Sequence, residues 1–180
     1  MAVLLAGGRS RVVLVGFMGA GKTRVGHLLA DLLQWDFVDL DALVVARKGK
    51  TVAAIFREEG EAAFRLAEHA AAVEATRAER VVIASGGGAF VASDTRSVLS
   101  ADAVTVWLRC ALPAILKRVA HDESRPLAAN RATISALLSE REPIYRLADL
   151  VVDTTTAAPR DTAREIATAV LDPGVGPIGR

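Results

Sequence analysis

The stretch "RVVLVGFMGAGKT", residues 11–23, decides the fold of this chain. Residues 12–15 are an apolar, mostly β-branched run, and residues 16–23 fit the pattern G-x-x-x-x-G-K-[ST]. A helical pattern begins directly after them. A strand, a glycine-rich loop and a helix N-terminus in this order make a cradle of backbone N–H groups that binds phosphate.

The loop predicts a site for a nucleoside triphosphate such as ATP. Its glycines let the backbone N–H groups point inward, Lys22 can reach the β- and γ-phosphates, and the Thr23 hydroxyl can ligand Mg²⁺. The alternative is a chance glycine turn before an amphipathic helix, which the joint match of pattern and context disfavours. The residues predicted to bind the nucleotide here are Gly19, Ala20, Gly21, Lys22, Thr23 and Arg24.

Short Val-rich runs alternate with longer Ala- and Leu-rich segments through the rest of the chain. Strands are predicted at 11–16, 36–40, 80–85, 103–109 and 150–154. Helices are predicted at 22–33, 41–48, 52–77, 93–100, 112–120, 131–147 and 159–171, with a kink or restart at Pro143. This alternation is typical of an α/β layer fold with a mostly parallel sheet covered by helices on both faces.

Composition limits the classes of partner. Lys and Arg number 22 against 21 Asp and Glu, so no strong basic field favours nucleic acid. No apolar run approaches the roughly 18 residues of a membrane-spanning helix. The N-terminus lacks the order of a signal peptide, and the single cysteine, Cys110, cannot form an internal disulfide. We therefore expect a cytoplasmic protein that binds small molecules, without nucleic-acid or membrane partners.

Two carboxylates close the second predicted strand, in "FVDLDAL". Asp39 and Asp41 would face the same side if the strand stays extended, at the edge where parallel sheets bind ligands. One could hold a metal-bound water and the other could orient or deprotonate an acceptor hydroxyl. Alternatively, Asp41 is only the N-cap of the next helix.

The helical segment "GEAAFRLAEHAA" places Arg65 and Glu68 three residues apart. The guanidinium of Arg65 could bind a substrate carboxylate in bidentate fashion, with Glu68 holding it in orientation. Alternatively, the two side chains form only an exposed ion pair on one helix face.

Together these motifs resemble the shikimate kinase family. The resemblance rests on "FVDLDALVVARKGKTVAAIFREEGEAAFRLAE" (37–68), "GGG" (86–88), "RPL" (125–127) and "REPIY" (141–145), and it extends over about residues 11–171. It implies a three-layer P-loop NTPase fold with a five-stranded parallel sheet flanked by helices. It also implies a mobile lid at about 118–130 and an acceptor-binding helical region at about 39–69.

The family phosphorylates the 3-hydroxyl of shikimate with ATP, a step towards chorismate. The resemblance implies that Asp41 binds the shikimate hydroxyls and acts as base, and that Asp39 and Thr23 lie around Mg²⁺. Lys22 and Arg125, the lid arginine, would contact the transferred phosphate, and Arg118 would lie beside adenine. The substrate-binding residues implied are Asp41, Arg65, Gly86, Gly87, Gly88 and Arg141.

The second glycine run thus receives the acceptor, because glycines leave backbone N–H groups bare for a small polyol. Ser85, just before it, could bind a water on Mg²⁺. Taken alone, three glycines could instead form a tight strand-to-helix turn without a ligand, and Arg125 could be a solvated surface charge. After the fifth strand, either Ala158 or Arg160 is expected to contact adenine.

Two alternatives of function remain open. A relative of the same fold could phosphorylate gluconate or a nucleotide. Alternatively, the domain could bind ATP and regulate or scaffold without catalysis, although Lys22, Asp41 and Arg65 are present. We expect one domain over residues 1–180, a monomer, with a flexible tail at 172–180.

Overall fold

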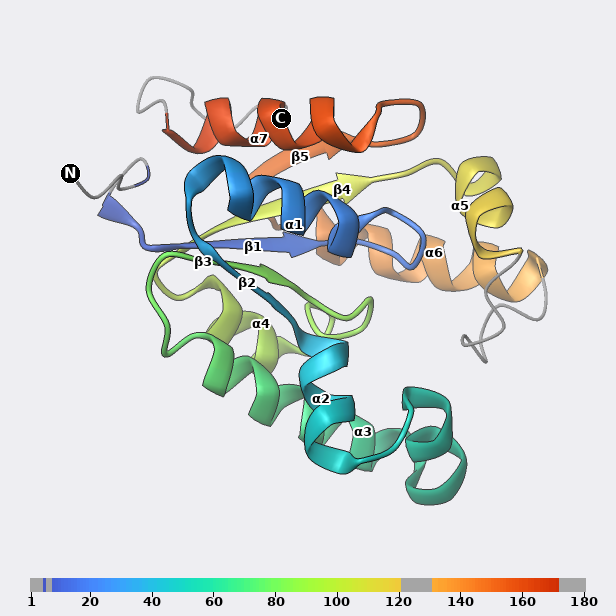
Figure 1. Ribbon diagram of the computed structural model, residues 1–180. Coiled ribbons are helices and arrows are strands. Elements are labelled where there is room, and N and C mark those ends of the chain that lie inside the picture. Colours follow the sequence, from blue (N-terminus) through green and yellow to red (C-terminus); the bar gives the residue numbers. More distant parts are fainter. Residues whose placement is uncertain (1–4, 6–7, 121–130, 172–180) are drawn as a thin grey trace.

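The computed structural model describes residues 5, 8–120 and 131–171 (Figure 1). Five strands form one sheet in the order β2-β3-β1-β4-β5, and every neighbouring pair is parallel. The five-stranded parallel sheet is therefore confirmed. The strands are β1 (Arg11–Val15), β2 (Asp36–Asp39), β3 (Val81–Ala84), β4 (Ala103–Arg109) and β5 (Leu150–Asp153).

Seven helices formed by the described residues cover the sheet. In Figure 1, α1 and α7 lie together on one side of the sheet, and α3, α4 and α6 lie on the other. The central strand β1 is consequently buried on both faces, with Val12, Val13, Leu14 and Val15 fully inaccessible. The helices are α1 (Lys22–Leu33), α2 (Leu40–Lys48), α3 (Val52–Ala75), α4 (Ser93–Ser100), α5 (Leu112–Val119), α6 (Arg131–Tyr145) and α7 (Pro159–Leu171).

Two helices differ from the prediction. Helix α3 is interrupted at Gly60, whose backbone angles (φ 84°, ψ 171°) are not helical, so the single helix expected at 52–77 is two helical pieces. Glycine tolerates such angles because it has no Cβ. Helix α6 runs through Pro143 without a restart and ends at Tyr145, two residues earlier than predicted.

The strand order brings the motifs together. The strand order reverses around β1, because the chain passes from β1 to β2 and β3 on one side and then crosses to β4 and β5 on the other. Ligands bind at such a switch point, beyond the carboxyl ends of the strands. The glycine loop of residues 16–23 follows β1, Asp39 ends β2, and the run 86–88 follows β3. All three therefore meet at one edge of the sheet.

Candidate active site

The first glycine loop turns sharply between β1 and α1. Gly16 has φ +140°, and a Cβ built on it would lie 2.7 Å from the Leu108 carbonyl oxygen of β4. Only glycine fits at this close approach. Gly21, at φ +96°, immediately precedes α1. The Lys22 ammonium lies across the loop and donates to the carbonyls of Gly16 (2.8 Å) and Phe17 (2.9 Å).

Thr23 and Asp39 meet where α1 and β2 approach each other. The Thr23 hydroxyl donates to Asp39 Oδ2 at 2.7 Å. The other oxygen, Oδ1, accepts from the backbone N–H groups of Asp41 (3.0 Å) and Ala42 (3.2 Å). Asp39 is thus the N-cap of α2, and the prediction that Asp41 might cap this helix is wrong. Because β2 ends at Asp39, Asp41 lies in the first turn of α2 rather than on an extended strand.

One cavity of about 380 Å³ collects most of the predicted acceptor residues. Its polar lining includes three carboxylates, two arginines and two glycines of the second glycine run. Apolar side chains from the first glycine loop, α2 and α3 complete the wall. The lining residues are Met18, Thr23, Asp39, Asp41, Val45, Thr51, Val52, Phe56, Phe64, Arg65, Glu68, Gly87, Gly88 and Arg141.

Arg65 is held by a buried carboxylate. Its Nη1 donates to Glu68 Oε2 at 2.6 Å, and Glu68 is only 1% exposed. Burial raises the pKa of the Glu68 carboxyl, an effect that the neighbouring Arg65 charge opposes and the Asp41 carboxylate reinforces. The alternative of an exposed Arg65–Glu68 pair is therefore wrong.

The second glycine run is packed tightly against these side chains. A Cβ on Gly86 would lie 2.3 Å from Glu68 Oε1 and 2.7 Å from Asp41 Oδ1. A Cβ on Gly88 would lie 2.3 Å from Arg65 Nη1. None of the three glycines has a positive φ, and residues 85–92 separate β3 from α4. Residues 87–91 do form a turn between β3 and α4, as in the tight-turn alternative, and side chains of Glu68, Asp41 and Arg65 approach this turn closely.

The carbonyl groups of the second glycine run accept hydrogen bonds. The Gly86 carbonyl accepts from the Ala89 N–H (3.2 Å), and the Gly88 carbonyl accepts from the Val91 N–H (3.0 Å). The Gly87 carbonyl accepts from the Tyr145 hydroxyl. Within the described part of the chain, the N–H groups of Gly87 and Gly88 donate no hydrogen bond. These two donors are available to a ligand, and their bond to an acceptor stays a prediction.

The hydroxyl of Ser85 forms a hydrogen bond within the sheet. It is buried and donates to the Leu14 carbonyl of β1 at 3.0 Å. This bond joins the end of β3 to β1 and leaves the hydroxyl oxygen able to accept a hydrogen bond, so a bond from a water on a metal to Ser85 stays a prediction.

Helix α6 contributes two residues to the site from one face. Arg141, 8% exposed, lines the cavity, and Tyr145, four residues later, is fully buried. Sequence reasoning selected Arg141 and missed Tyr145. The spacing of four residues in "REPIY" was the available signal, because it places both side chains on the same helix face.

Arg118 joins the first glycine loop to the segment after β5. Its guanidinium donates to the carbonyls of Gly19 (3.1 Å), Thr154 (2.7 Å) and Thr155 (3.3 Å), and to Cys110 Sγ (3.2 Å). Ala158 and Arg160 are exposed at the start of α7. Arg125, most of the predicted lid and the predicted flexible tail at 172–180 lie outside the described residues.

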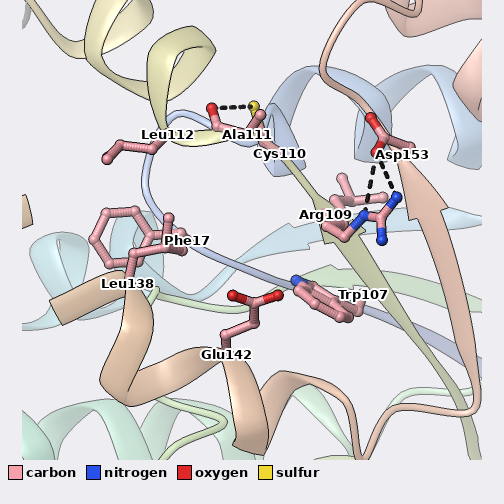
Figure 2. A pocket seen from close by; sticks show the side chains of 10 residues that line it. Phe17, Trp107, Arg109, Cys110, Ala111, Leu112, Leu138, Glu142 and Asp153 are labelled. Atoms are coloured by element: carbon pink, nitrogen blue, oxygen red, sulfur yellow. Dashed lines mark hydrogen bonds and ion pairs between the residues drawn. The ribbon is translucent and has the colours of Figure 1, made fainter. Parts of the chain in front are cut away.

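A second cavity, also of about 380 Å³, is lined by residues of α6, the end of β4 and the start of α5 (Figure 2). Trp107 and Glu142 line it, together with the exposed ion pair between Arg109 and Asp153. None of the residues predicted for the site lines this cavity. Arg141 and Glu142, adjacent on α6, thus face different cavities.

The described residues lack two kinds of feature. They contain no helix that is both long and apolar enough to cross a membrane. They also contain no cluster of three or more His, Cys, Asp or Glu side chains suited to a metal ion.

Comparisons with known proteins agree on one family. The family model for shikimate kinase matches residues 18–171. A shikimate kinase of Halorhodospira halophila is 45% identical over 165 residues, which cover 89% of this chain and 93% of that protein. Shikimate kinase from Acinetobacter baumannii, solved in complex with shikimate, superimposes with a TM-score of 0.85 at 36% identity, covering 88% of this chain and 90% of that one.

A more distant neighbour shares only the fold. The gluconokinase from Sinorhizobium meliloti superimposes with a TM-score of 0.58 at 18% identity, covering 89% of this chain and 90% of that one.

Proposed function

Because this chain belongs to the shikimate kinase family, we propose that the cavity beside the first glycine loop is where it phosphorylates shikimate with ATP. The products are shikimate 3-phosphate and ADP, in the route to chorismate. The observation that carries this assignment is the lining of one cavity. It combines the guanidinium groups of Arg65 and Arg141, the Asp41 carboxylate and two glycine N–H groups that donate no hydrogen bond to the described residues.

The acceptor end of the cavity suits a hydroxylated carboxylate. Arg65 and Arg141 supply the cationic forks that bind the carboxylate of shikimate. Asp41, in the first turn of α2, accepts hydrogen bonds from the ring hydroxyls. The apolar wall, which includes Val45 and Phe56, packs against the carbon ring.

The nucleotide end is the loop of residues 16–23. Its backbone N–H groups and the N-terminus of α1 hold the phosphates of ATP, and Lys22 exchanges its two carbonyl acceptors for phosphate oxygens. Arg118 lies beside the adenine, where it already joins Gly19 to the segment after β5. The resemblance adds Arg125, outside the described residues, as a cation on the phosphates from a lid at about 118–130.

The residues around Thr23 fit a magnesium ion. The Thr23 hydroxyl and the Asp39 carboxylate, 2.7 Å apart, are both oxygen ligands of the kind that Mg²⁺ prefers. When bound there, Mg²⁺ neutralises charge on the β- and γ-phosphates.

Phosphoryl transfer forms one bond at the γ-phosphorus and breaks another. The 3-hydroxyl oxygen of shikimate attacks the γ-phosphorus of ATP, and the bond from that phosphorus to the β,γ-bridging oxygen breaks. ADP leaves, and the hydroxyl proton passes to Asp41. Lys22 stabilises the charge on the equatorial oxygens, so positioning and electrostatics account for most of the catalysis.

The test is ADP release by the purified protein with ATP and Mg²⁺. Shikimate, gluconate, a mixture of nucleoside monophosphates and no acceptor are compared, each with and without EDTA. Strong stimulation by shikimate alone, lost in EDTA and restored by added Mg²⁺, is the expected result. Stimulation by gluconate instead would favour the alternative polyol kinase. ATP binding without stimulation by any acceptor would favour a non-catalytic domain.

We further propose that residues 1–180 act as one domain and as a monomer. Its core extends over about 11–171, and residues 39–69 form the acceptor-binding region. Light scattering of the eluted peak in size-exclusion chromatography would give the mass of a single 18.9 kDa chain.

A further inference from the structure

A hydrogen bond connects α6 to the second glycine run, and nothing in the proposed chemistry uses it. The Tyr145 hydroxyl donates to the Gly87 carbonyl. We propose that Tyr145 is a positioning residue: by holding this carbonyl, it directs the Gly88 N–H towards the carboxylate of the bound acceptor. The inference rests on the proposed function, because the acceptor is the carboxylate-bearing substrate assigned there.

Because the peptide group is planar, the orientation of the Gly87 carbonyl fixes that of the Gly88 N–H. The Gly87 carbonyl and the Gly88 N–H belong to one trans peptide and point in opposite directions. A bond that pulls the carbonyl towards α6 therefore turns the N–H away from α6.

A peptide between two glycines has little else to orient it. Without a Cβ on either residue, the peptide can rotate about its flanking bonds at low cost. The neighbouring peptides are held by backbone bonds, since the Gly86 and Gly88 carbonyls accept from Ala89 and Val91. The Gly87–Gly88 peptide has only Tyr145 to hold its carbonyl among the described residues.

Two arginines near the Gly87–Gly88 peptide indicate that the Gly88 N–H would meet an anion. A Cβ built on Gly88 would lie 2.3 Å from Arg65 Nη1, and one built on Gly87 would lie 3.5 Å from Arg141 Nη1. The peptide therefore lies between the two guanidinium groups that line the cavity. An anion bound by both arginines is within reach of the Gly88 N–H.

Tyr145 is built as a rigid donor. Its side chain is fully buried, and its ring centroid lies 6.2 Å from that of Trp107. Burial raises the pKa of Tyr145 to about 12, against a smaller lowering by Arg141. The hydroxyl consequently keeps its proton at every pH at which the enzyme would work.

The test is Tyr145→Phe, which keeps the ring and removes only the hydroxyl. We expect the KM for shikimate to rise about 5- to 30-fold, the size of one lost hydrogen bond in a desolvated site, with the KM for ATP within twofold of wild type. The matched control is Thr105→Val. It also removes a buried hydroxyl, one that donates to Asp149 at 2.8 Å, but at a site that lines neither cavity.

The control separates positioning from general loosening of the fold. Thr105→Val should lower the melting temperature and leave both KM values unchanged. In [¹⁵N]glycine-labelled protein, Tyr145→Phe should move the Gly88 amide resonance and the control should not.

Three results would overturn the inference. One is a KM for shikimate within twofold of wild type in folded Tyr145→Phe, and another is an equal rise in the KM values for ATP and shikimate. The third concerns the wild-type protein alone: no response to shikimate would refute the proposed function itself, and the role of Tyr145 with it.

Discussion

Arg65 Nη1 lies 2.6 Å from Glu68 Oε2, and the carboxylate that holds it is almost completely buried. On the exposed side, Glu61 Oε1 accepts two further bonds, from Arg65 Nε at 3.3 Å and from Nη2 at 3.1 Å. The second oxygen of Glu68, Oε1, has no hydrogen-bond partner among the described residues. Two carboxylates thus orient the guanidinium before any substrate arrives, which lowers the entropy lost when the substrate binds.

Replacement of Arg65 by alanine should weaken acceptor binding. Removing one member of a buried charge pair and the partner of a substrate carboxylate costs about 2–4 kcal/mol, or roughly 30- to 1,000-fold in the KM for shikimate. The KM for ATP should not change. Steady-state kinetics with each substrate varied in turn would measure both.

The control for this variant is Arg57→Ala, on the same helix. Arg57 is 74% exposed and pairs only with the exposed Glu58 among the described residues. It should leave both KM values unchanged. A KM for shikimate within twofold of wild type in Arg65→Ala would refute the carboxylate clamp.

Replacement of Asp41 by asparagine should lower kcat and preserve ATP binding. The amide keeps the shape of the side chain but cannot take the hydroxyl proton, and loss of a general base costs about 100- to 10,000-fold. ATP affinity would be measured by calorimetry with a non-hydrolysable analogue. If affinity fell as much as turnover, Asp41 would act on the metal and not on the acceptor.

Replacement of Lys22 by alanine should reduce kcat by about 100- to 1,000-fold, the cost of losing one preorganised cation at the transferred phosphate. Lys117→Ala, which removes an exposed lysine from α5, is the matched control and should retain wild-type turnover. Turnover of Lys22→Ala within tenfold of wild type would contradict a role for this ammonium in the transition state.

Replacement of Gly86 by alanine should displace both acceptor-side carboxylates. The new Cβ would meet Glu68 Oε1 at 2.3 Å and Asp41 Oδ1 at 2.7 Å, so these carboxylates must shift, and Glu68 is buried. We expect a loss of about 1–3 kcal/mol in the free energy of unfolding, as for an overpacked core, together with a higher KM for shikimate.

Gly8→Ala provides the comparison for Gly86→Ala. A Cβ on Gly8 would meet nothing within 4 Å, although its φ of +73° strains any other residue. Chemical denaturation should show both variants destabilised, and only Gly86→Ala should alter the kinetics of shikimate. Equal kinetics in the two variants would show that crowding at Gly86 does not reach the acceptor.

The pKa of Tyr145 predicts a loss of stability at high pH. The folded protein holds this proton up to about pH 12, whereas an unfolded tyrosine releases it near its ordinary value of 10.0. The contribution to stability is therefore complete below pH 10 and is lost as pH rises towards 12. It amounts to about 2–3 kcal/mol for a shift of this size.

A titration of tyrosine absorbance reports on Tyr145 alone, because it is the chain's only tyrosine. Tyrosinate absorbance near 295 nm should rise near pH 12 in the folded protein and near pH 10 in urea. Urea unfolding from pH 8 to 11.5 should show wild type losing stability relative to Tyr145→Phe above pH 10. Coincident titrations in the folded and unfolded states would refute the burial effect.

The sequence alone determined the sheet and the phosphate loop, because both depend on local patterns. Five Val-rich runs became the five strands, and the loop at 16–23 lies between β1 and α1 as expected. It also identified Asp41, Arg65, Gly87 and Arg141, which line one cavity. Residue type and position already suggested roles for Asp41 and Arg65, whereas those of Gly87 and Arg141 rested on resemblance to a family, since residues so far apart in the chain carry no local sign of contact.

Only the tertiary structure decided how these residues support one another. Burial of Glu68 turned what could have been a surface ion pair into a fixed guanidinium, and no helical pattern reveals which carboxylate faces the core. The capping role passed from Asp41 to Asp39 because β2 ends one residue earlier than the pattern suggested. The bond from Tyr145 to Gly87 joins residues 58 positions apart. Such relationships depend on how helices pack on the sheet, which the hydrophobic pattern of each element leaves undetermined.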